Sequence, residues 1–388
     1  MAQLLRVPIR KEIWLWAIRE SGKDRAEIAD KFPKIEQWIN GDEHPTFKQA
    51  EEAAAFLRVP FGYLFLASPP QDPVAAEFRA LRGRQPEMSK NLKDTILDMA
   101  MRRNWMSKYR RNLGWDRLEI ITQFQEQASG QAAADAFLAR KLLQLRDKWH
   151  EEPRDLDTIA NQLKKKLEAS GILVMQSGIV GTSTRRRLDV SEFRAFTLFD
   201  PVAPLIFINR SDTPTGRVFS LVHQFIHVLS GEDDLFTAQD ADVVADPSTI
   251  SVLTVEFLMP EAEIRDLWNE AEALPAQIER LCRMFKVSRW ALTARLKNLG
   301  LIDAEAAAQL EAGLESSAAA QSEDSSSSAK PPTPNYYRTY SSRISPVFKE
   351  AVVKSAEAGE IEYTYAFKLL GVNGKSYDKV KKDVMDHG

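Results

Sequence analysis

Two histidines lie four residues apart in the stretch RVFSLVHQFIHVLSG, at positions 223 and 227. The apolar residues around them predict a buried helix, and residues at i and i+4 share one helix face about one turn apart. The imidazole nitrogens of His223 and His227 could therefore converge on one ion, and imidazole is a common ligand of zinc. The spacing predicts a zinc site on this helix.

The residue after the first histidine decides what such a site can do. In zinc peptidases with an H-E-x-x-H helix this residue is a glutamate, which acts as the general base. Here the general-base position holds Gln224, whose amide has no accessible protonation equilibrium. We therefore expect hydrolysis to be lost or very weak, while zinc binding can survive. The H-x-x-x-H spacing alone is a weak signal, because most such pairs are packed or exposed without a metal.

Short apolar blocks precede this helix. GILVMQSG, FRAFTLFD and APLIFINR are rich in β-branched and aromatic residues, which is typical of strands. A helix is expected before them, near residues 156–169, and from Gly216 the pattern returns to helix. The chain is thus expected to be α+β and mainly helical, with a small sheet that positions the histidine helix.

The residues around HQFIH resemble the ImmA/IrrE family of metallopeptidases. The stretch SEFRAFTLFDPVAPLIFINRSDTPTGRVFSLVHQFIH resembles the family's order of strand, strand and metal helix, and VEFLMP (255–260) resembles its Leu-Met-Pro signature. FKVS (285–288) is similar to the start of its closing helices. The N-terminal stretch KFPKIEQWINGDEHPTFKQAEEAAAFLRVPFGYLFLASPP is similar to a helix-turn-helix of the XRE type. The resemblance covers roughly residues 10–70 and 155–300.

The resemblance implies a third zinc ligand, a glutamate shortly before the Leu-Met-Pro signature. In VVADPSTISVLTVEFLMP the aligned position is Pro247, and the nearest carboxylate is Asp246. Asp246 is therefore the candidate third ligand, although the neighbouring proline disfavours a continuous helix there. Two departures, Gln224 and Pro247, favour a natural pseudopeptidase. An engineered glutamate-to-glutamine substitution at 224 is the alternative.

Composition and periodicity divide the chain into five parts. The region 303–335 is rich in Ala, Ser and Pro and is expected to be a flexible linker, because it cannot bury enough apolar surface to fold. After it, two short helices are expected around Gly359. The expected parts are a helix-turn-helix-like domain (1–71), a helical connector (72–150), a metallopeptidase-like domain (151–302), the linker (303–335) and a small helical C-terminal module (336–388).

The N-terminal domain is expected to hold four helices. The first ends near Gly22, the second spans Arg25–Phe32, the third spans Lys34–Asn40 with Gly41 as its C-cap, and Thr46 caps the fourth. The candidate DNA-binding residues are Lys34, Glu36 and Gln37, at the exposed start of the third helix, and Lys48. Lys48 could contact the phosphates of the DNA backbone. A link of only Phe32–Pro33 would be short for a helix-turn-helix, which leaves a protein-docking domain as the alternative.

Bulk properties restrict the class of protein. The net charge of −3 argues against nucleic-acid binding by overall charge. The single cysteine, Cys282, excludes an intramolecular disulfide and a Cys-rich zinc site, a pattern that fits a reducing cytoplasm. No apolar run approaches the roughly 20 residues that span a bilayer. We therefore expect a cytoplasmic protein with no membrane contact.

These observations favour a regulatory protein, either a transcriptional regulator or an antitoxin-like protein. Its partners would be a protein (a repressor or a toxin) and operator DNA. The alternative is an active zinc metallo-endopeptidase that cleaves a repressor-type protein. A third hypothesis is a scaffold whose C-terminal module binds the partner.

Overall fold

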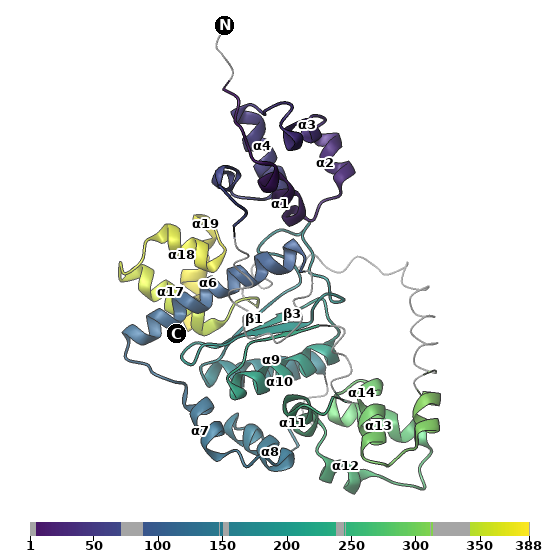
Figure 1. The fold of residues 1–388 in the computed structure, drawn as a ribbon. Coiled ribbons are helices and arrows are strands. Elements are labelled where there is room, and N and C mark those ends of the chain that lie inside the picture. The colour runs from purple at the N-terminus through teal and green to yellow at the C-terminus, as the bar shows by residue number, and fades with distance from the viewer. Residues whose placement is uncertain are drawn as a thin grey trace. The chain divides into compact units, whose positions relative to one another are not determined.

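The structure is a computed structural model of the 388-residue chain (Figure 1). It describes residues 5–70, 88–146, 148–149, 155–237, 244, 246–310, 312 and 342–387. The chain divides into two compact units, residues 1–79 with 84–97 and residues 80–83 with 98–388, and each has its own hydrophobic core. The described residues are mainly helical with one small sheet, which confirms the α+β prediction. No helix among them is both long and apolar enough to cross a membrane.

Between residues 5 and 70 the first unit is helical. Its elements are α1 (Lys11–Ser21), α2 (Arg25–Lys31), α3 (Ile35–Asn40), α4 (Phe47–Leu57) and the 3-10 helix η1 (Phe61–Phe65). Trp14 and Trp38 are buried in its core, with their ring centroids 5.9 Å apart. Gly22 and Gly41 end α1 and α3 with φ of 62° and 83°, and Thr46 forms a capping box at the start of α4. The predicted caps are thus confirmed.

The link between α2 and α3 is longer than the sequence suggests. Helix α2 ends at Lys31, since Phe32 has a non-helical φ of −128°, and α3 begins only at Ile35. The expectation of a two-residue link is therefore wrong, because Lys34 is the N-cap of α3 and lies outside the helix. Three residues, 32–34, form the turn, which is the usual length in a helix-turn-helix.

The second unit contains a sheet of four strands among its described residues, β1 (Leu173–Ser177), β2 (Ala195–Leu198), β3 (Leu205–Asn209) and β4 (Asp234–Phe236), in the order β1-β3-β2-β4. Strand β1 pairs parallel with β3, whereas β2 pairs antiparallel with β3 and β4. The three predicted strands are present, and β4 is an addition that the sequence did not suggest. The helices that precede β4 are α6 (Lys90–Asn112, which the boundary between the units divides), α7 (Glu119–Gln127), α8 (Ala132–Leu142), α9 (Leu156–Ala169) and α10 (Pro214–Ser230).

Both faces of the sheet are covered. Every residue of β2 and β3 is buried, which is the pattern of strands packed on two sides. Helices α9 and α10 pack against one face, and the part of α6 in the second unit, residues 98–112, runs along the other (Figure 1). Arg110 of α6 donates hydrogen bonds to the carbonyl oxygens of Gly171 and Val202, next to β1 and β3. The histidine helix α10 is therefore clamped between the sheet and other helices.

The segments expected as connector and linker contribute to this same core. In the expected connector, α7 and α8 are helical as predicted, and their apolar residues, such as Phe124 and Ala136, belong to the main cluster of the second unit. At the other end, α11 (Thr249–Leu258), α12 (Glu261–Leu267), α13 (Leu274–Phe285) and α14 (Arg289–Asn298) follow the sheet. Residues 304–310 are also helical, and Ala307 is buried. The part of the expected linker from 313 to 335 lies outside the described residues.

The C-terminal module has one helix more than expected. Helices α17 (Pro346–Glu357) and α18 (Tyr363–Leu370) lie on either side of Gly359 as predicted, and α19 (Gly374–His387) follows them. The segment before α17 runs beside β1, where the backbone N–H of Gln176 donates to the carbonyl oxygen of Arg343 at 2.9 Å. Trp105 of α6 and Phe348 of α17 make an edge-to-face contact with centroids 5.5 Å apart. The module is thus docked on the sheet of the second unit.

A buried carboxyl group, Glu168 of α9, connects this module to the sheet. Its Oε2 accepts a hydrogen bond from Ser345 Oγ (2.6 Å) and its Oε1 accepts one from the backbone N–H of Val174 (2.9 Å). Burial raises the pKa of Glu168 to about 7, although nearby Lys164 opposes the shift. The native protein therefore holds a proton on Glu168 at mildly acidic pH.

We expect Glu168→Gln to change how stability depends on pH. Because the pKa of Glu168 rises from 4.5 to about 7 on folding, the native state binds more protons than the unfolded chain between these values. The wild-type free energy of unfolding therefore falls as pH rises through this window. In the glutamine variant the free energy of unfolding does not fall across this window. The wild-type fall that the variant lacks is on the order of 3 kcal/mol. Urea unfolding at mildly acidic and mildly alkaline pH measures it, and a difference between the two proteins that does not change with pH would contradict the assignment.

Candidate metal centre

Helix α10 carries both histidines of the HQFIH motif. Thr213 caps its N-terminus by accepting a hydrogen bond from the backbone N–H of Gly216, and Gly231, with φ of 81°, ends it. Every residue from Leu221 to Leu229 is buried, because the helix packs against β2, β3, α9 and α11. A polar side chain in this stretch must therefore find its partners inside the protein.

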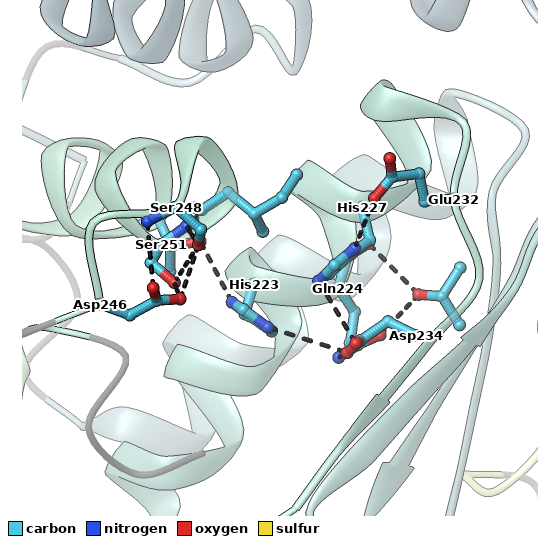
Figure 2. A network of polar contacts seen from close by, with 11 residues as sticks. His223, Gln224, His227, Glu232, Asp234, Asp246, Ser248 and Ser251 are labelled. Carbon is cyan, nitrogen blue, oxygen red and sulfur yellow. Dashed lines mark hydrogen bonds and ion pairs between the residues drawn. The ribbon is translucent and has the colours of Figure 1, made fainter. Parts of the chain in front are cut away.

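The two imidazoles share one side of α10 and face a carboxylate from β4 (Figure 2). His223 Nε2 lies 3.8 Å from Asp234 Oδ2, and His227 Nε2 lies 3.5 Å from Asp234 Oδ1. Ligand atoms of the three residues all lie within 4.8 Å of one another. Among the residues that the structure describes, no other group of three such side chains converges in this way.

A threonine on α11 fixes the tautomer of His223. Thr254 Oγ1 donates to the carbonyl oxygen of Ile250 (2.8 Å), so toward His223 Nδ1, at 3.3 Å, it can only accept. Nδ1 then carries the proton, and the lone pair of Nε2 points at the carboxylate of Asp234. Two electron-pair donors face each other, and a cation between them satisfies both.

Burial keeps His223 uncharged. It lowers the pKa of the imidazole to about 4, even though the carboxylate of Asp234 acts in the opposite direction. At neutral pH His223 is therefore in the form that coordinates a metal. The positive charge that would lie between His223 Nε2 and Asp234 therefore does not come from protonation of His223. A bound metal ion can supply it.

Two imidazole nitrogens and one carboxylate oxygen form a ligand set that fits zinc. Sites with three protein ligands of these types leave a fourth position open. On His227 the second nitrogen, Nδ1, lies 4.0 Å from the exposed carboxylate of Glu232, beyond hydrogen-bond distance. The orientation of His227 therefore depends on the packing of α10 more than on this contact.

Gln224 is fully buried, and its amide is committed at both ends. Its Nε2 donates to Asp234 Oδ2 at 2.7 Å, and its Oε1 accepts from Thr197 Oγ1 of β2 at 2.7 Å (Figure 2). The amide thus orients Asp234 toward the histidines and uses one of its two N–H donors to do so. It has no proton acceptor to offer a substrate.

The structure does not bring Asp246 into the cluster. Its carboxylate accepts hydrogen bonds from the backbone N–H and hydroxyl of Ser248 (3.0 and 2.6 Å) and from the hydroxyl of Ser251 (2.7 Å) (Figure 2). These bonds hold Asp246 at the entry to α11, whose N-cap is Ser248. Residue 246 therefore precedes α11, and its carboxylate is not part of the group of ligand atoms that converges at His223 and His227.

Asp234 is the residue that sequence reasoning missed. It belongs to GEDDLF, where a short acidic run directly follows the glycine that ends α10. The strand that positions it, β4, is only three residues long and pairs with β2, almost 40 residues earlier in the chain. Period-two alternation cannot be recognised over three residues. The acidic run next to the HxxxH helix was the available signal.

The candidate DNA-binding residues lie on the surface of the first unit. Lys34, Glu36, Gln37 and Lys48 are all exposed. Lys34 Nζ pairs with Glu43 at 2.8 Å, and Glu36 pairs with Arg25 at 3.7 Å. These exposed pairs are weak and can be exchanged for other partners. The exposed start of α3 is thus available as a contact surface.

Residues 167–297 match the family model described as the IrrE N-terminal-like domain. This range contains all four strands of the described sheet, together with α10 and α11. Searches of curated proteins and of solved structures find no match. The second unit therefore contains an IrrE-like domain, and the metal-centre geometry lies inside it.

Proposed function

We propose that this chain is a regulatory protein whose IrrE-like domain binds zinc through His223, His227 and Asp234 without hydrolysing peptide bonds. Zinc, when bound, supplies a Lewis acid and a fixed positive charge at the buried end of the site. The side chains of the protein hold the ligands in place, with Thr254 orienting His223 and Gln224 orienting Asp234.

The observation that carries this proposal is that the side-chain amide of Gln224 is hydrogen-bonded on both its nitrogen and its oxygen. A hydrolytic site needs a group at this position that accepts a proton in the transition state and releases it to the leaving amine. Gln224 donates to Asp234 and accepts from Thr197, both at 2.7 Å. It can hold the site together, but it cannot move a proton. The metal centre is therefore a structural and recognition element.

The regulatory role is proposed because the chain combines this IrrE-like domain with the separate N-terminal unit. The first unit, with its three-residue turn between α2 and α3 and the exposed side chains at the start of α3, is proposed to contact operator DNA or a protein partner. The IrrE-like domain is proposed to recognise a protein, a repressor or a toxin, without cutting it. The competing function, an active endopeptidase, requires a base that replaces Gln224.

We expect the purified full-length chain to hold one zinc ion and to leave candidate repressor proteins uncut. Metal analysis after dialysis against zinc gives the stoichiometry, and gel analysis of the mixtures detects cleavage. His223→Ala serves as the matched metal-free control. Cleavage by the wild-type chain that His223→Ala abolishes would show an active peptidase. A chain that takes up no zinc would remove the metal part of the proposal.

The DNA-binding part has a separate test. A mobility-shift assay at low salt with the DNA upstream of the protein's own coding sequence shows whether the first unit binds it. A shift that Gln37→Ala and Lys48→Ala weaken supports operator binding. If the wild-type chain gives no shift at low salt, the first unit acts as a protein-docking domain.

A further inference from the structure

A second polar cavity lies in the IrrE-like unit, apart from the metal centre. It has a volume of about 200 Å³ and is bounded by α9, α10 and the strands β1 and β3. Its lining side chains are polar or charged around a small apolar floor. They include Asn161 and Lys164 of α9, Gln176 of β1, Arg210 after β3 and Arg217 of α10. None of them belongs to the metal cluster.

The cavity occupies a place in the fold that favours anions. β1 and β3 are parallel, and Gln176 and Arg210 lie at their carboxyl ends. Asp157 and Arg217, which also line it, come from the first turns of α9 and α10. Crevices at the carboxyl ends of parallel strands, beside helix N-termini, are where anionic groups bind in α/β structures.

Positive charge in the cavity exceeds negative charge. Lys164, Arg210 and Arg217 line it with a single carboxylate, Asp157. Asp157 pairs with Arg217 at 2.7 Å. Among the described residues, Lys164 Nζ and Arg210 Nη1 bind the carbonyl oxygen and the hydroxyl of Ser342, at 3.2 and 3.0 Å, which carry no charge. Two cationic groups thus face the cavity with neutral partners.

Two further observations concern how well these cationic groups are satisfied. Arg217 Nε is buried and has no hydrogen-bond partner in the described structure. Burial, together with the nearby charges of Lys349 and Arg210, lowers the pKa of Lys164 to about 8 despite the attraction of Glu168. An anion in the cavity would satisfy the first group and relieve the repulsion on the second.

We propose that this cavity binds the phosphate group of a small phosphorylated molecule. The amide of Gln176 already donates to the carbonyl oxygen of Ser342 at 2.8 Å. The two guanidinium groups, the ammonium group and the amide of Asn161 still form a donor set that suits the three or four oxygens of a phosphate better than the two oxygens of a carboxylate. The volume of about 200 Å³ accommodates a phosphate with a small organic substituent. The proposal is independent of zinc binding and of peptidase activity.

The test is a calorimetric titration of the full-length chain with inorganic phosphate at constant ionic strength, with chloride as the balancing anion. We expect saturable binding of one phosphate per chain. Lys164→Met and Arg210→Met should each weaken it about tenfold, the effect of removing one charge-assisted hydrogen bond. Arg210 is exposed, so its variant should fold normally even if Lys164→Met, at a half-buried position, does not.

Two control variants separate this site from other causes. Arg185→Met removes an exposed arginine outside the cavity and should bind phosphate as the wild type does. His223→Ala should also retain binding, because it alters only the metal centre. Heat signals that never saturate, or that Arg210→Met leaves unchanged, would overturn the proposal. Loss of binding in His223→Ala would assign the phosphate to the metal centre instead.

Discussion

Asp234→Asn is expected to weaken zinc binding by a factor on the order of 100 or more, similar to the loss of either histidine. The carboxylate of Asp234 lies 3.8 and 3.5 Å from the Nε2 atoms of His223 and His227 and completes the ligand set. Asparagine keeps the size of the side chain but removes the negative charge, and even partners outside the ligand shell change metal affinity about 10- to 100-fold. Competition with a chromophoric chelator measures the affinity.

Asp246→Asn is the matched control for this prediction. Asp246 was the third ligand that the sequence suggested, and it accepts hydrogen bonds from Ser248 and Ser251 at the start of α11. Its loss should reduce stability slightly and leave the zinc affinity within about twofold of wild type, because Asp246 is not in the converging group of His223, His227 and Asp234. If Asp246→Asn weakens zinc binding more than Asp234→Asn does, the assignment of the third ligand is wrong.

Gln224→Glu is expected to destabilise the metal-free protein by about 3–5 kcal/mol at mildly alkaline pH, the range found when a buried charge is left without compensation. In the wild type, Gln224 Nε2 donates to Asp234 Oδ2 at 2.7 Å. A glutamate there places two carboxylates at hydrogen-bond distance with no proton between them. Added zinc should restore much of the stability, because a cation held by Asp234 would offset the repulsion between the two carboxylates. Chemical unfolding with and without zinc measures this effect.

Gln224→Met separates charge repulsion from the loss of hydrogen bonds. It has nearly the length of glutamine and removes both bonds of the amide without adding a charge. Its destabilisation should not depend on pH, whereas the glutamate variant should recover at acidic pH as the two carboxyl groups share a proton. Equal stability of Gln224→Glu and wild type at alkaline pH without zinc would mean that residue 224 does not contact Asp234.

Sequence patterns predicted the parts of the site that local spacing determines. The i, i+4 histidines, the helix expected from Gly216 onward and the three longer strands depend on residues within one element. Local signals of this kind are read directly from periodicity and capping residues. The departure at Gln224 was visible for the same reason, because its position is defined by its neighbour His223.

Contacts between distant segments could not be predicted. Asp234 reaches the histidines because β4 pairs with β2, and three residues carry no recognisable strand pattern. Gln224 is held by Thr197, 27 residues earlier in the chain. The docking of Ser345 on Glu168 joins residues 177 positions apart. Each of these contacts depends on how separate elements pack together. The periodicity of a single sequence reports on individual elements and does not show which elements pack against one another.

The most direct test of the metal centre is a zinc-loaded crystal structure of the full-length chain with anomalous data at the zinc edge. The ligand assignment predicts one zinc ion within roughly 2.0–2.2 Å of His223 Nε2, His227 Nε2 and an oxygen of Asp234, with the amide of Gln224 still bonded to that carboxylate. Zinc ligated by Asp246 instead of Asp234, or no anomalous signal between the two histidines, would contradict it.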